Sequence, residues 1–547
     1  MGIPSYYKRL LDKQPALVTK AHPGSIDWLW MDFNCLMYHC LRAPDLRAFP
    51  GVEGLTEWEG ELLDRIVAYT ERVVREVGPK EGVYIAVDGV VPMAKMRQQR
   101  LRRFKSSWLS EAGLAEGQVA GVARWDTNAL TPGTAFMGRL RRLFEETIAR
   151  RRLPWTFSSS DEPGEGEHKI MAQWRKGGVR GSRYTEPPPE GGATSTSRDS
   201  CPERFAVYGL DADLVVLSLL TQDTLHRAGQ PIEVWLFREQ VEEGAMVRDE
   251  KGETQFHWFD VNLLRGQIHI ELGSGAVNIQ DYCFAMSFLG NDFLPPSLSL
   301  KMREDGHEQL LEALRRLRAP LVNTDRVERG ERSICEGGLH TLLAGFADTE
   351  EGRTWRSVDR KLSMAARATD ETSLGQANWA LVQGAEDCLL DLGTGRTKPP
   401  LSAMWRSAYY SKLLGGVPPA AAVQKYLEGV QWIWNYYKGE DVCFNWVYPW
   451  TLPPLWSDFK HATLPSVPPV LLRSADIRTA EQLCLVLPPA SGHLLPSLHW
   501  RFAAAAPWLF PASFGFGSAG KRWFWECEPE IPVPTLLEVK AVLSKLS

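Results

Sequence analysis

The sequence predicts an α/β fold with a mixed, mainly parallel sheet flanked by helices. Its first third alternates strand-like and helix-like segments, in the order IDWLWMDF, a helical stretch at residues 62–77, and GVYIAVDG. This alternation is typical of parallel strands connected by helices. The chain has 547 residues, 44% of them hydrophobic, which is enough to bury a large core and corresponds to about two to four domains.

The carboxyl ends of the expected strands carry acidic residues. Asp32 ends IDWLWMD, Asp88 ends VYIAVD, and Asp211 and Asp213 follow FAVYGL. Because the carboxyl ends of parallel strands meet at one edge of a sheet, these side chains should converge there. The blocks PGEGEHK and LGNDFLPP supply three more acids, so the expected set is Asp32, Asp88, Glu165, Glu167, Asp211, Asp213 and Asp292.

This set of carboxylates predicts a divalent-metal site suited to phosphodiester hydrolysis. Clustered carboxylates raise each other's pKa unless cations hold them ionised, and hard divalent cations prefer oxygen ligands. Single members have simpler interpretations: Glu165 and Glu167 could begin a helix, where negative charge suits the dipole, and Asp292 could be a turn residue. Asp32 and Asp88 are harder to explain in this way, because each follows an apolar strand and would lose hydration without a partner.

A basic segment follows Asp88 in the sequence DGVVPMAKMRQQRLRRFKSSW, which places six Lys or Arg residues within eleven positions. If the segment is helical, Lys95, Gln99, Arg102 and Arg103 fall at i, i+4, i+7 and i+8 and share one face. Arginine forks, an amide and a lysine can together bind one phosphate. A solvated basic face or a localisation signal is the alternative, but the position directly after VDG favours phosphate binding.

Composition indicates a globular protein of a reducing compartment. The net charge is only -5, so any nucleic-acid surface must come from local clustering of basic residues. The nine cysteines are scattered and include no CxxC pair, which argues against a disulfide framework or a zinc site. The start MGIPSYYKRLLDKQP lacks an apolar leader core, and no apolar run is long enough to span a membrane. We expect an intracellular monomer without a membrane partner, in the cytoplasm rather than the nucleus.

Two changes in composition divide the chain. Residues 176–204 are rich in Gly, Pro, Ser and Thr, which indicates a flexible insertion without a catalytic role. Beyond about Phe346 the pattern changes to amphipathic helices, an aromatic segment and Pro-rich connections. We therefore predict a catalytic domain at 1–346 and a second, helical and aromatic-rich region at 347–547.

Several blocks resemble one known family. MGIPSYYKRL, VDGVVPMAKMRQQRLRRF, LTPGTAFM, PGEGEHKIM, YGLDADLVVL and LGNDFLPPSLSL are similar to the signature blocks of the Xrn family of 5′→3′ exoribonucleases, in the family's order. YLEGVQWIWNYYKG, NWVYPWTLPPLWSDF, EQLCLVLPPASGHLLP and GKRWFWE resemble the family's second conserved region. The resemblance implies a catalytic core of the PIN and flap-nuclease type, with a second, mostly helical region that packs against it and shapes the substrate channel.

The resemblance also implies roles for particular residues. It assigns the seven acids to the binding of catalytic Mg²⁺ or Mn²⁺, two ions in the expected mechanism, and Lys95, Gln99, Arg102 and Arg103 to a pocket for the 5′-terminal phosphate. Trp432 in EGVQWIW matches a tryptophan that lies beside the first nucleotides of the substrate, although a core position is an equal alternative in a chain with 21 tryptophans.

One position departs from the family pattern. The family often has a base-stacking histidine six residues after the first catalytic aspartate, whereas this chain has Tyr38 there and a histidine at His39. Tyr38 can stack on a base equally well, and a one-residue offset points His39 elsewhere.

The expected function is processive 5′→3′ degradation of single-stranded RNA that carries a 5′ monophosphate. Two-metal hydrolysis would release nucleoside 5′-monophosphates. One alternative is a structure-specific flap nuclease acting on DNA, although such enzymes lack blocks like EGVQWIW and NWVYPW. Another is a catalytically silent RNA-binding scaffold, which loss of metal ligands would indicate, and none of the seven acids is missing.

Overall fold

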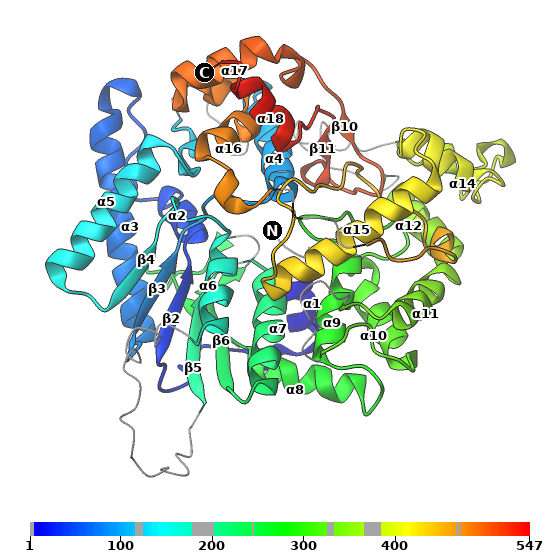
Figure 1. Cartoon of the computed structure of the whole chain (residues 1–547), viewed down its shortest axis with the longest axis horizontal. Helices are drawn as coiled ribbons and strands as arrows, with labels where there is room; N and C mark the ends of the chain where they lie inside the picture. The colour runs from blue at the N-terminus through cyan, green and yellow to red at the C-terminus, as the bar shows by residue number, and fades with distance from the viewer. Residues whose placement is uncertain are drawn as a thin grey trace.

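The structure is a computed structural model that describes residues 5–114, 124–177, 202–209, 211–242, 245–324, 333–365, 384–466, 470 and 472–546. A large sheet with helices on both faces forms one side of the molecule, and helices from the later parts of the chain form the other side and the top (Figure 1). Most of the expected insertion at 176–204, namely residues 178–201, lies outside the described residues.

The main sheet has seven strands in the order β1-β9-β6-β5-β2-β3-β4. Five neighbours run parallel: β6 (Ile232–Glu239), β5 (Glu203–Tyr208), β2 (Trp28–Asp32), β3 (Gly82–Ala86) and β4 (Trp155–Ser158). β9 (Phe256–Asp260) is antiparallel to β6, and the short β1 (Val18–Thr19) is antiparallel to β9. The predicted mixed, mainly parallel sheet is therefore confirmed.

Alternate residues of the central strands build two separate cores, one on each face of the sheet. Leu29 and Met31 of β2 pack with α2 (Asn34–Leu41), α3 (Leu55–Val77) and α5 (Ala135–Arg151). Trp30, between them, points to the opposite face and packs with α6 (Gly166–Arg175) and α7 (Asp213–Arg227). The strands read as continuous apolar runs because both faces are covered.

The core behind Trp30 also contains helices from both ends of the chain. It includes side chains of these helices: α1 (Tyr6–Lys13), α8 (Val261–Leu272), α9 (Ile279–Ala285), α10 (Gly306–Arg316), α11 (Glu336–Ala347) and α15 (Pro419–Lys438). The predicted helical region packed against the sheet is thus present, and one core contains residues from both sides of position 346. The division at that position stays a prediction.

Helix α4 (Met93–Glu111) connects the sheet to the last part of the chain. Its first turns and residues before it pack with α16 (Thr479–Val486), α17 (Pro496–Ala505) and α18 (Leu536–Leu543), and Figure 1 shows α4 beneath these helices. Arg100 is fully buried, and its guanidinium donates to the carbonyl oxygens of Leu485 (2.7 Å), Pro532 (3.0 Å) and Leu509. The basic segment is therefore a helix, as predicted, but one of its arginines has a structural role.

The remaining helices lie outside the sheet and its two cores. α12 (Glu350–Ala365) and the short α14 (Trp405–Ala408) contribute to a smaller apolar cluster with Leu389 and Tyr409. Among all the described helices, not one has both the length and the apolarity that a membrane crossing requires.

Candidate active site

The ends of three adjacent strands bring the first acids together. Asp32 is the last residue of β2 and lies opposite Ala86, the last residue of β3, and Asp88 follows two positions later. β5, on the other side of β2, leads through Asp211 into α7, which begins at Asp213. The structure thus places these four acids at one edge of the sheet, where the strand pattern predicted them.

Glu165 and Glu167 lie at the same edge of the sheet, at the start of α6. The sequence PGEGEHK needs a glycine between them, because a Cβ atom at Gly166 would lie only 2.6 Å from Asp32 Oδ1 and 2.9 Å from the Ala86 oxygen. The Gly166 amide also donates to Asp88 Oδ1 at 2.7 Å. The close approach of α6 therefore fixes the positions of the acids relative to one another.

Asp88 is also held from the other side, by Asn34 at the start of α2. Asn34 Nδ2 donates to Asp88 Oδ2 at 2.6 Å, and the Asp88 amide donates to Asn34 Oδ1 at 3.2 Å. Sequence reasoning missed Asn34, although its position two residues after Asp32 in MDFN was a usable signal.

Lys95 lies among the acids and joins two of them. Its Nζ is 2.5 Å from Glu165 Oε2 and 2.8 Å from Asp292 Oδ2. Asp292 follows the turn that ends at Leu289, and its side chain is only 5% exposed. The other oxygen of Glu165, Oε1, accepts a hydrogen bond from the hydroxyl of Tyr436 in α15 at 2.8 Å. Tyr436 therefore extends the site into the second part of the chain.

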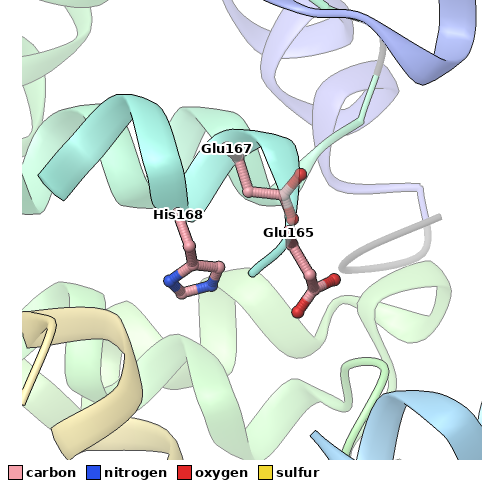
Figure 2. Close-up of side chains that lie close together, drawn as sticks. All are labelled: Glu165, Glu167 and His168. Atoms are coloured by element: carbon pink, nitrogen blue, oxygen red, sulfur yellow. The ribbon is translucent and has the colours of Figure 1, made fainter. Parts of the chain in front are cut away.

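Among the described residues, Glu165, Glu167 and His168 form a compact group of side chains that could hold a metal ion. One ligand atom of each lies within 4.8 Å of the others, and Figure 2 shows all three projecting from the start of α6. The His168 ring stacks on Tyr436 with centroids 3.9 Å apart. His168 was not predicted, although it directly follows Glu167 in the PGEGEHK block.

The charges of the cluster are not balanced. Burial and the neighbouring carboxylates raise the pKa of Asp32 and of Glu167 well above the usual range, and the same causes raise the pKa of Asp213 to about 7. Burial opposes the charge of Lys95, yet the acids beside it raise its pKa well above the ordinary value. Lys95 pairs with only two of these buried carboxylates, Glu165 and Asp292, and an oxygen-rich set of this kind fits hard divalent cations.

The four predicted phosphate-binding residues divide into three environments. Lys95 is paired with the acids. Gln99 and Arg103 are largely buried, and Gln99 Oε1 and Arg103 Nη1 have no hydrogen-bond partner among the described residues. Burial lowers the pKa of Arg103 to about 10. Arg102 is exposed and lines a cavity whose wall also includes Asp292. Gln99 and Arg103 are therefore the members with buried, unused donor or acceptor atoms.

The predicted stacking residues differ in their accessibility. Trp432 is 3% exposed, stacks on Tyr436 (5.0 Å) and Trp446 (5.2 Å), and donates from Nε1 to the Cys443 oxygen at 2.9 Å. A base could reach its ring only after a neighbour moves, so Trp432 is part of the core in this structure. Its stacking role stays a prediction.

Tyr38 and His39 point in different directions, as the one-residue offset in α2 predicted. The His39 ring is buried against Tyr69 of α3, with centroids 4.3 Å apart, and burial lowers its pKa. Tyr38 is only partly buried and lies near Arg103. Of the two, Tyr38 is the better placed for a base.

Comparisons with known proteins match both parts of the chain. Residues 1–227 match the family model described as the XRN 5′-3′ exonuclease N-terminus, and residues 409–543 match the model described as the Xrn1 helical domain.

Curated relatives match over nearly the same extent. Human 5′-3′ exoribonuclease 1 is 27% identical over 97% of this chain and 33% of its own length. 5′-3′ exoribonuclease 2 of Candida albicans is 23% identical over 97% of this chain and 71% of its own length. The Schizosaccharomyces pombe enzyme of the same name is 31% identical over 53% of this chain and 31% of its own length. The chain thus spans about a third of the human relative. With both family models matched in their expected order on this fold, the chain belongs to the Xrn family.

Proposed function

We propose that the protein is a 5′→3′ exoribonuclease that degrades single-stranded RNA with a 5′ monophosphate. The observation that carries the proposal is the buried cluster of acids at the strand ends, whose negative charge exceeds what Lys95 neutralises. Family membership and the printed names of the relatives support the same reaction class.

The acids would hold divalent cations, Mg²⁺ or Mn²⁺, and two ions are the number we propose. Bound metal would supply an activated water and stabilise both the attacking and the leaving oxygen of an in-line displacement. Glu165, Glu167 and Asp32 are buried, so their carboxylates are fixed before substrate arrives. Tyr436 and Lys95 orient the two oxygens of Glu165. Glycine at position 166 lets α6 approach Asp32 closely enough for these groups to act together.

The preference for a monophosphate would come from the predicted phosphate pocket on α4. The buried Nη1 of Arg103, a donor without a partner among the described residues, supports an anionic ligand at this place. A phosphate there would satisfy the guanidinium, whereas a 5′ hydroxyl would leave it unpaired, and a cap or triphosphate would clash. After each cut the new 5′ phosphate would occupy the same pocket, which favours processive digestion.

One digestion experiment tests the proposal. The same uniformly labelled RNA is prepared with a 5′ monophosphate, hydroxyl or triphosphate and incubated with the protein and Mg²⁺, and the first products are identified. We expect mononucleotides from the monophosphate RNA. Asp32→Asn should abolish the activity, and Asp64→Asn, an equal charge change at an exposed position of α3, should not. A branched DNA is incubated in parallel: internal cuts in it would indicate a flap nuclease, and no cleavage of any substrate would favour the scaffold alternative.

A further inference from the structure

A cavity of about 240 Å³ lies along the side of α4 that carries Arg97, Leu101 and Lys105. Its other walls come from residues 289–296, residues 301–304, Tyr448, Trp450 and parts of the segment 520–529. We call it the α4 cavity. Because Asp292 contributes to its wall, the cavity opens beside the acid cluster.

The lining of the α4 cavity is rich in positive charge. It contains seven Lys or Arg side chains and four Asp or Glu side chains. Three of the carboxylates are engaged by arginines of the cavity: Arg97 with Glu528 at 3.1 Å, Arg303 with Glu526 at 2.6 Å, and Arg522 with Glu304 at 2.5 Å. The fourth, Asp292, is engaged by Lys95 from outside the lining.

Two cations of the cavity lie near carboxylates, Arg102 near Asp292 and Lys521 near Glu528, without being paired to them. Within the described part of the chain, neither the guanidinium of Arg102 nor the Nζ of Lys521 makes a hydrogen bond or an ion pair. Two more lysines donate mainly to neutral oxygens: Lys105 to the carbonyls of Trp525 and Cys527, both at 2.7 Å, and Lys301 to the Gly520 carbonyl at 2.9 Å. Burial lowers the pKa of Lys105, and it lowers that of Lys301 to about 8. The positive charge here is thus incompletely compensated.

Polar and aromatic groups accompany these cations. Gln98 and Asn291 line the cavity, and each has one buried atom, Oε1 and Nδ2, without a hydrogen-bond partner in the described residues. Trp525, also in the lining, is 58% exposed, and the Arg303 guanidinium lies over its ring at 4.9 Å. In single-stranded nucleic acid, unpaired cations bind the phosphates, and unpaired amides bind hydroxyls or base edges. An exposed indole can stack on the face of a base.

We propose that the α4 cavity binds the RNA backbone on the 3′ side of the scissile bond. This inference rests on the proposed function and assigns the substrate a direction: the terminal phosphate lies by Gln99 and Arg103, the scissile phosphate by the acids, and the following nucleotides along Lys521 and Trp525. An acidic peptide would satisfy the lysines but would make less use of the exposed indole, and the shared wall at Asp292 favours the substrate itself.

The test compares substrates of two lengths. A 5′-monophosphorylated dinucleotide has the scissile phosphate but no backbone beyond its second nucleoside, whereas an RNA of about twelve nucleotides fills the cavity. We expect Lys521→Glu to lower kcat/KM at least tenfold on the long RNA and less than threefold on the dinucleotide. Loss of one phosphate contact should also reduce the slope of log(kcat/KM) against log salt by about 0.7. Trp525→Ala, at an exposed position, should lower kcat/KM on the long RNA without changing the salt slope.

The matched control is Lys545→Glu, which makes the same charge change at an exposed lysine outside the cavity. The proposal is overturned if Lys521→Glu affects both lengths equally or behaves like Lys545→Glu on the long RNA. It is also overturned if Lys521→Glu changes the ratio of monophosphate to hydroxyl substrates, because the cavity would then hold the 5′ end. Failure of the proposed function is distinguishable, since the unchanged protein would then digest neither RNA.

Discussion

Replacing Tyr436 with phenylalanine removes the hydroxyl that donates to Glu165 Oε1 at 2.8 Å and leaves the ring that stacks on His168 and Trp432. A hydrogen bond to a charged acceptor contributes about 1.5–3 kcal/mol. Glu165 keeps its contact with Lys95 through its second oxygen, so we expect the lower end of this range. Since about 1.4 kcal/mol is a factor of ten, kcat/KM should fall about tenfold at limiting Mg²⁺.

The assay is steady-state digestion of 5′-monophosphorylated RNA across a Mg²⁺ titration. If the hydroxyl orients Glu165 for metal binding, the half-saturating Mg²⁺ concentration should rise, and excess Mg²⁺ should recover part of the activity. Burial and the Glu165 charge raise the pKa of Tyr436 well above its usual value, so the hydroxyl stays protonated and the effect should not depend on pH near neutrality.

The neighbouring tyrosine provides a matched control. Tyr437 is also buried in α15, but its hydroxyl has no hydrogen-bond partner among the described residues. Tyr437→Phe should therefore change kcat/KM less than threefold and leave stability equal or slightly higher, since it removes an unpaired buried hydroxyl. Equal effects of the two substitutions would refute the reasoning, as would a Tyr436→Phe protein with unchanged Mg²⁺ dependence.

Three further outcomes are expected. Lys95→Met should lower the free energy of unfolding by about 3–5 kcal/mol in EDTA, because two buried carboxylates lose their cation, and by less in Mg²⁺; equal losses in urea titrations would contradict this. The raised pKa values of Asp32 and Asp213 mean that the metal-free fold binds more protons than the unfolded chain. Stability in EDTA should therefore fall as pH rises from about 4 through about 7, and Mg²⁺ should raise Tm more at pH 8 than at pH 5.5; a pH-independent gain would argue against these sites. Arg103→Ala should reduce the preference for monophosphate over hydroxyl ends at least tenfold, measured as a ratio of kcat/KM values, and an unchanged ratio would remove Arg103 from the pocket.

The sequence predicted the parts of the site that depend on local pattern. Apolar runs ending in Asp32 and Asp88 predicted adjacent parallel strands, and the spacing from Lys95 to Arg103 predicted a helix. Helical spacing did not predict the ion pairs of Lys95. Its long, flexible side chain extends away from the other residues of that helix face and pairs with Glu165 and Asp292.

Local sequence patterns could not predict the contacts between distant segments. The hydrogen bond from Tyr436 to Glu165 joins residues 271 positions apart, and no periodicity in either segment encodes it. Trp432 shows the same limit, because its aromatic neighbours can be read from the sequence but their packing around its ring cannot.

The burial of Arg100 has a consequence for how the protein can be divided. Its guanidinium donates to carbonyl groups of residues 485, 509 and 532. A polypeptide that stops before them would lose these acceptors together with the apolar residues of α16, α17 and α18 that cover α4. The neighbouring turns of the same helix carry Lys95 and Arg103. Shortening the chain at its far end should therefore disturb the start of α4 and the acid cluster, and residues 1–346 alone should not be active.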